Sequence, residues 1–194
     1  FRRVLFRSPQ IFIIFINQLS VMLERDGGRG VFISPHIGDV YSLMFADDVS
    51  SVSDSAMQLQ KKINVVEKFC AETGMKVNLS KTKIIVFRNG GPLRHYEKWY
   101  LNGTEIEVVN MYRYLGIVFT PKLSWTKAKS CLSSQARKAV FSIDNYQRRF
   151  GYLNHHELFK IFDAMISPIL CYGSEVWGTA YCNIIESVHT KFCK

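Results

Sequence analysis

The sequence predicts an α+β protein, with a strand-rich part over residues 9–120 followed by a helical part over 121–194. Between residues 31 and 119 the apolar residues come in short runs separated by Gly and Asn turn signals, which is typical of strands. From residue 124 onward the apolar period changes to about 3.6, which is typical of helices. With 47% hydrophobic residues, the 194-residue chain can bury a sizeable core.

The first eight residues and the charge need separate treatment. FRRVLFRS over 1–8 resembles the translation of a sequencing adapter, so we exclude it from fold reasoning. The apolar run over 11–16 is too short for a membrane helix. The formal net charge is +9, three of these charges coming from residues 1–8, and a basic chain favours nucleic acid or anionic membranes. Five scattered cysteines without a CxxC pair predict neither a zinc site nor disulfides.

The strand-rich part is expected to open with a helix and to centre on a β-hairpin. Residues 9–23 place apolar side chains at helical spacing after an initial proline, and a Gly-rich loop follows. Val31–Ser34 is predicted to be a strand. Residues 41–53 are predicted to form a hairpin, because two strand-like runs flank Asp47 and Asp48, which then lie at its tip.

A second helix and three further strand segments follow. The residues 53–55 can all cap a helix, and an apolar pattern at steps of three and four then continues to Gly74. Residues 84–87 are predicted to be a buried strand. Residues 100–106 are predicted to be a hairpin that turns at an Asn-Gly pair, and 114–119 another strand.

Three helices are predicted in the second part of the chain. The first covers 124–150 and ends at a glycine. Asn154 and Glu157 form a capping box for the second helix, which is expected to end at Pro168. The third begins near Cys182.

Asp47 and Asp48 carry the clearest chemistry in the sequence. Two adjacent carboxylates between apolar strands repel each other unless a cation lies between them, and carboxylate oxygens are the ligands that Mg²⁺ prefers. In a two-metal site such ions stabilise the attacking and leaving oxygens of a phosphoryl transfer. Taken alone, the pair is also compatible with a solvated turn at a hairpin tip.

The order of motifs around this pair resembles the reverse transcriptases of non-LTR (LINE-type) retrotransposons. FADD over 45–48 is followed by an amphipathic helix, GMKVNLSKTK over 74–83, YLGI over 114–117 and SPILCYGSEVWG over 167–178. The resemblance extends over residues 9–194 and depends on the ordered set rather than on one motif. It implies a partial polymerase palm, an antiparallel sheet with packed helices, over 9–120. It implies a helical, thumb-like module over 121–194.

The resemblance also implies roles for individual residues. Asp47 and Asp48 match the metal-binding pair, with Asp47 the expected direct ligand. Lys81 matches the lysine proposed to protonate the leaving pyrophosphate, with Lys83 as the second choice, although both lysines could simply lie on an exposed turn. Tyr114, Leu115 and Gly116 match the hairpin that holds the primer end, and simple core packing is the alternative for the tyrosine.

Basic residues of the long helix are candidates for following a nucleic-acid backbone, as a polymerase thumb does. Such phosphate contacts carry no sequence information and weaken with salt. A solvated helix face would explain the same residues. The four candidates are Lys127, Lys129, Arg137 and Lys138.

The function implied is RNA-directed DNA polymerisation. The intact parent would extend a DNA primer on an RNA template with deoxynucleoside triphosphates and two Mg²⁺ ions, or Mn²⁺, and would be intracellular, in cytoplasm and nucleus, with no membrane partner. We expect the chain itself to be an inactive fragment, because a further catalytic aspartate of the family would lie before residue 9. Two alternatives stay open: a catalytically dead nucleic-acid-binding remnant of a retroelement, and an α+β protein with an incidental Asp-Asp turn.

Overall fold

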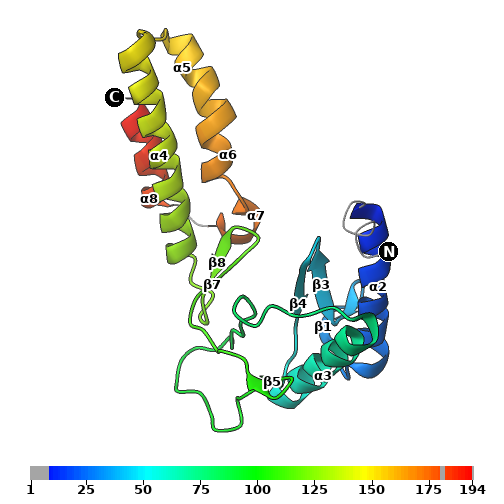
Figure 1. Cartoon of the computed structure of the whole chain (residues 1–194). Helices are drawn as coiled ribbons and strands as arrows, with labels where there is room; N and C mark the ends of the chain where they lie inside the picture. The colour runs from blue at the N-terminus through cyan, green and yellow to red at the C-terminus, as the bar shows by residue number, and fades with distance from the viewer. Residues whose placement is uncertain (1–8, 180–181, 194) are drawn as a thin grey trace. The chain divides into compact units, whose positions relative to one another are not determined.

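The computed structural model, which describes residues 9–179 and 182–193, combines helices with two-stranded antiparallel sheets (Figure 1). This confirms the prediction of an α+β protein. The chain forms two compact units: the first contains the described residues up to Ile84 together with Gly91–Val108, and the second contains Ile85–Gly90 and the described residues from Val109 on. The FRRVLFRS segment, interpreted above as an adapter, lies outside the described residues.

The core of the first unit forms between helices α2 (Pro9–Asp26) and α3 (Ala56–Thr73). Leu23 of α2 and Phe69 of α3 are almost completely buried, and burial of such a side chain contributes about 1.5–3 kcal/mol. The predicted boundaries of α3 are confirmed, because the Ser55 hydroxyl accepts from the Gln58 N–H and Gly74 ends the helix with φ 66°.

The strands in the described part of the first unit pair as three hairpins: β1 (Val31–Ser34) with β2 (Gly38–Val40), β3 (Ser42–Phe45) with β4 (Asp48–Ser51), and β5 (Tyr100–Leu101) with β6 (Thr104–Glu105). The predicted strand β1 and the two predicted hairpins are confirmed, whereas β2 was not expected. Asn102 and Gly103 both have positive φ, 48° and 72°, as the predicted Asn-Gly turn requires.

The strand predicted over 84–87 is wrong. Ile84 makes an isolated parallel bridge with Val108, and its N–H donates to the Glu107 carbonyl at 3.0 Å. The chain then passes into the second unit at Ile85, where the Arg88 N–H donates to the Pro121 carbonyl. A strand needs a continuous backbone partner, and this apolar run leaves its partner after one bridge.

The described residues of the second unit form a hairpin and a group of helices. The hairpin consists of β7 (Tyr112–Tyr114) and β8 (Ile117–Phe119). The helical elements are α4 (Thr126–Phe150), α5 (His155–Ile161), the π-helix η1 (Phe162–Ile166), α6 (Ser167–Leu170), α7 (Ser174–Trp177) and α8 (Asn183–Phe192). Their core joins side chains of α4, η1, α6 and α8, among them Ala136, Val140, Ile166 and Val188. The capping box of Asn154 and Glu157 is confirmed.

Two predictions for this unit need correction. The single strand expected over 114–119 is interrupted by a turn at Leu115 and Gly116, whose φ values of 46° and 85° reverse the chain. The helix after Asn154 does not end at Pro168 either. In η1 the Ser167 N–H donates to the Phe162 carbonyl, five residues back, and Pro168 then lies in the first turn of α6, where a missing N–H is tolerated.

Within the described part of the chain, no helix has the length and apolar character needed to cross a lipid bilayer.

Candidate active site

Asp47 and Asp48 lie at the tip of the β3–β4 hairpin. Phe45 pairs with Asp48, so Ala46 and Asp47 form a two-residue turn. Ala46 has φ 52°, a left-handed value at a turn position where glycine is usual. This conformation costs an alanine about 1–2 kcal/mol. The backbone that carries the two aspartates is therefore held in a strained turn, a feature that often accompanies functional sites.

Both carboxylates are open to ligands. Each aspartate is exposed, and neither carboxylate has a hydrogen-bond or ion-pair partner among the described residues. The described residues also contain no group of three or more His, Cys, Asp or Glu side chains that could hold a metal ion. Mg²⁺ commonly binds one or two carboxylates and takes its other ligands from water and substrate phosphates. The two adjacent carboxylates fit that mode of binding.

The hairpin is anchored to the core of the first unit through one of its faces. Met44 packs against the α2–α3 cluster, whereas its neighbours Leu43 and Phe45 are 52% and 62% exposed. The alternation follows from the strand period of two, which points successive side chains to opposite faces.

A buried lysine holds the base of the same hairpin. Lys62 on α3 is fully buried, and its Nζ donates to the carbonyls of Val52, at 2.5 Å, and Tyr41, at 3.4 Å. These two residues flank strands β4 and β3. Burial lowers the pKa of Lys62, and the charge of Asp54 partly opposes this shift.

Sequence reasoning missed Lys62, although a signal was present. It lies three positions after Leu59 and four before Val66, and is therefore on the apolar stripe of α3. A lysine within an apolar stripe must either reach solvent or find buried acceptors, and Lys62 finds the two carbonyls.

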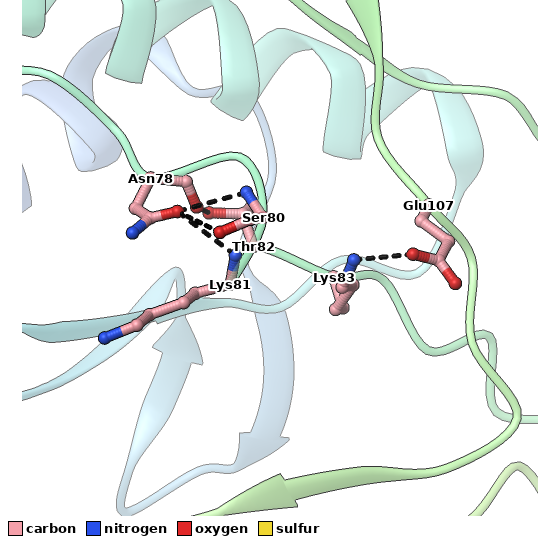
Figure 2. Close-up of polar contacts among 6 residues, drawn as sticks. All are labelled: Asn78, Ser80, Lys81, Thr82, Lys83 and Glu107. Atoms are coloured by element: carbon pink, nitrogen blue, oxygen red, sulfur yellow. Dashed lines mark hydrogen bonds and ion pairs between the residues drawn. The ribbon is translucent and has the colours of Figure 1, made fainter.

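Lys81 and Lys83 lie on the loop after α3 in different surroundings (Figure 2). The Asn78 side-chain oxygen accepts from the backbone N–H groups of Ser80 and Lys81 and from the Ser80 hydroxyl, which fixes the loop as a turn. Lys83 is engaged inside the unit, because its Nζ lies 2.5 Å from the Glu107 carboxylate. Lys81 is exposed, and its side chain extends away from both Asn78 and the Lys83–Glu107 pair (Figure 2).

The predicted primer-binding turn belongs to the second unit. Tyr114 ends β7 and is half-buried, Leu115 is exposed, and Gly116 completes a turn in which both central residues have positive φ. The Arg113 side chain contacts the turn, because its Nε donates to the Gly116 carbonyl at 3.2 Å. Asp47, Asp48 and Lys81 all belong to the first unit.

The four basic candidates do not share one face of α4. Lys127 and Lys138 are both exposed and lie eleven positions apart, about three helical turns, which places them on the same side. Lys129 is half-buried, with its Nζ 5.5 Å from the centroid of the Trp177 ring. Arg137 donates to the Ser187 hydroxyl of α8 at 3.1 Å. Two of the four side chains are thus occupied by contacts within the unit.

Comparison with known proteins identifies the family. The reverse transcriptase (RNA-dependent DNA polymerase) family matches residues 5–119, more than half of the chain, so the chain belongs to this family. The relatives found come from mobile elements, and the chain is a reverse transcriptase sequence of the non-LTR retrotransposon type.

Two of these relatives are informative. An uncharacterized transposon-derived protein of Caenorhabditis elegans is 24% identical over 137 residues, which cover 70% of this chain and 48% of the relative. The RNA-directed DNA polymerase from the mobile element jockey of Drosophila funebris is 21% identical over 149 residues, covering 74% of this chain and 16% of that protein. The chain therefore spans about half the length of the first and about a sixth of the second. No solved structure matches the chain significantly.

Proposed function

We propose that the parent protein is an RNA-directed DNA polymerase and that the β3–β4 hairpin is its metal-binding element. The observation that carries the proposal is the hairpin tip, where Asp47 and Asp48 are adjacent and exposed on a turn strained at Ala46. Their carboxylates have no partner among the described residues. In this assignment residues 9–120 form a partial palm and 121–194 a thumb-like module, with 1–8 left out as an adapter sequence.

The proposed reaction is transfer of a deoxynucleotide to the 3′ hydroxyl of a DNA primer paired with an RNA template. Asp47 would be the direct ligand of Mg²⁺ or Mn²⁺, with Asp48 beside it. The divalent ions supply the positive charge that stabilises the attacking and leaving oxygens. Lys81 is the proposed proton donor to the leaving pyrophosphate, because it is exposed and occupies the position that matches the family's lysine, whereas Lys83 is half-buried and paired with Glu107. This places general acid catalysis on one side chain.

Nucleic acid is the proposed partner of the second unit. The primer 3′ end would bind at the turn formed by Tyr114, Leu115 and Gly116. Lys127 and Lys138 would contact phosphates, because they share an exposed face of α4. Lys129 and Arg137 are proposed to contribute less, since both make contacts within the unit.

A titration with Mn²⁺ tests the metal-binding hairpin directly. Paramagnetic broadening of backbone NMR signals should be concentrated at residues 45–48, and Asp47→Asn should weaken the affinity by at least roughly tenfold, because a direct ligand is lost. The measurement does not depend on polymerase activity.

Asp39→Asn is the matched control for this titration. Asp39 is an exposed aspartate of the neighbouring β1–β2 hairpin, so its loss removes the same charge and should leave the broadening unchanged. Equal broadening at 45–48 in wild type and Asp47→Asn would contradict the assignment. Nucleic-acid binding without any Mn²⁺ binding at the hairpin would instead favour the catalytically dead remnant.

A further inference from the structure

Tyr172 contacts the proposed primer-binding turn from a distant part of the sequence. Its hydroxyl donates to the Leu115 carbonyl at 2.7 Å, across 57 positions of the chain. Its ring also lies against Gly116, because a Cβ built on that glycine would be only 2.9 Å from the Tyr172 Cε1. Both central residues of the turn are therefore in contact with one side chain of the same unit.

The segment around Tyr172 is itself fixed against the hairpin. Gly173 has φ 66°, a left-handed value that favours glycine, and a Cβ at this position would meet the Ile117 Cδ1, so the segment lies directly against the β8 side chain. Trp177 is 5% exposed, and its indole Nε1–H donates to the Tyr172 carbonyl at 2.9 Å. Figure 1 shows α7, which contains Trp177, beside the β7–β8 hairpin.

These contacts connect the turn to the basic helix. Lys129 of α4 lies over the Trp177 ring, Trp177 binds the Tyr172 backbone, and the Tyr172 hydroxyl binds the turn. The chain of contacts is continuous and lies wholly within the second unit. This series of contacts gives a physical role to the CYGSEVW sequence over 171–177. It also explains why the Lys129 side chain lies over Trp177 and not in solvent, where it could contact phosphates.

We propose that Tyr172 is a positioning residue for the primer strand: its hydroxyl holds Leu115 and Gly116 in the conformation that receives the primer 3′ end. The inference rests on the proposed function, because it takes residues 114–116 as primer-binding. Leu115 has φ 46°, which is unfavourable for a leucine, so the contact from Tyr172 adds to that of Arg113 in stabilising this shape of the turn. A turn that is ordered before binding loses less conformational entropy when the primer arrives.

The test compares two RNA–DNA hybrids of equal paired length, one with a recessed primer 3′ end and one blunt. Binding of each to the full chain is measured by fluorescence anisotropy. Wild type should prefer the recessed end, and Tyr172→Phe, which removes only the hydroxyl, should weaken that binding roughly two- to tenfold, the usual effect of one hydrogen bond. Binding to the blunt hybrid should not change. Trp177→Phe, which releases the Tyr172 carbonyl, should act in the same direction.

Tyr152→Phe is the matched control, because Tyr152 is 87% exposed and its hydroxyl has no hydrogen bond among the described residues. If wild type shows no preference for the recessed end, the primer-binding role of 114–116 is wrong and the role of Tyr172 fails with it. If wild type has the preference and Tyr172→Phe keeps it, only the role of Tyr172 is wrong. An equal loss on both hybrids would reduce Tyr172 to general support of the fold and would also overturn the proposal.

Discussion

Two charged side chains of the β3–β4 region, Asp47 and Lys62, differ in their exposure to solvent. Asp47 is exposed at a hairpin tip, whereas Lys62 is fully buried beneath the same hairpin. The burial of Lys62 is tolerated because its Nζ donates to the carbonyls of Tyr41 and Val52 at the base of the hairpin. A buried ammonium without such acceptors would be strongly destabilising.

The stability of the protein should therefore depend on pH through Lys62. Burial lowers the folded-state pKa of Lys62 below its ordinary 10.5. At pH values between the folded-state pKa and 10.5, Lys62 is protonated in the unfolded chain but not in the folded protein. The free energy of unfolding should therefore rise with pH across this range, by about 1.4 kcal/mol for each pH unit that the range covers. Below both values Lys62 adds no pH dependence. Urea unfolding at a series of alkaline pH values measures the rise.

Lys62→Met should abolish this rise, because position 62 no longer carries a titrating group. Lys61→Met is the control: Lys61 is the exposed neighbour on α3, and its loss should leave the rise in place. A rise that persists in Lys62→Met would show that another group is responsible.

At the scale of elements, helix ends determine how the second unit is assembled. The Asn154 side chain accepts from the Glu157 N–H at 2.9 Å, and the Glu157 carboxylate accepts from the Asn154 N–H at 3.1 Å. These reciprocal bonds begin α5 directly after the loop at Gly151. They therefore fix where the chain reverses between α4 and the helices that pack against it.

Asn154→Ala should destabilise the second unit by about 1 kcal/mol, because the first turn of α5 loses its cap. Thermal unfolding followed by circular dichroism measures the change. Asn145→Ala is the control, since Asn145 lies inside α4 and serves no cap, and it should have a smaller effect. Equal effects of the two substitutions would argue that the capping box contributes little.

Elements with local signals could be predicted from the sequence. Ser55 and Gly74 mark the ends of α3, and Asn102-Gly103 marks a hairpin, because each signal acts through its own backbone. Two failures have non-local causes. Residues 84–87 have strand composition, yet the chain leaves the first unit after Ile84. Leucine does not favour the left-handed conformation that Leu115 adopts, and Tyr172, whose hydroxyl donates to the Leu115 carbonyl, lies 57 positions further along the chain.

In the candidate site, too, the features with local sequence signals could be predicted and those that depend on tertiary contacts could not. Asp47 and Asp48 could be placed at a hairpin tip from the flanking apolar runs, and the structure has them there. The burial of Lys62 and the occupation of Lys129 by Trp177 could not be predicted, because both depend on tertiary contacts. The roles assigned to Asp47, Lys81 and the 114–116 turn stay predictions.

At the scale of the whole molecule, the net charge of +9 predicts salt-dependent binding to nucleic acid. The double variant Lys127→Gln/Lys138→Gln should reduce the slope of log affinity against log salt by roughly two, close to one for each phosphate that the protein no longer neutralises. Filter binding of a duplex over a range of salt concentrations measures the slope.

The control for the salt dependence is Lys160→Gln/Lys191→Gln, which removes the same charge from exposed positions on α5 and α8. If both double variants change the slope equally, the effect comes from net charge and not from the shared face of Lys127 and Lys138.

The path of the chain between the two units has a consequence for how the protein behaves when it is cut. Ile85–Gly90 belongs to the second unit and Gly91–Val108 to the first, so the polypeptide passes between the units three times. A nick between Gly90 and Gly91 would yield two pieces, each of which supplies residues to both units. Neither piece could fold a whole unit alone, and the two would remain associated as a complementing pair. Each unit is compact but is built from two separate stretches of the polypeptide, so neither corresponds to one continuous segment of the sequence.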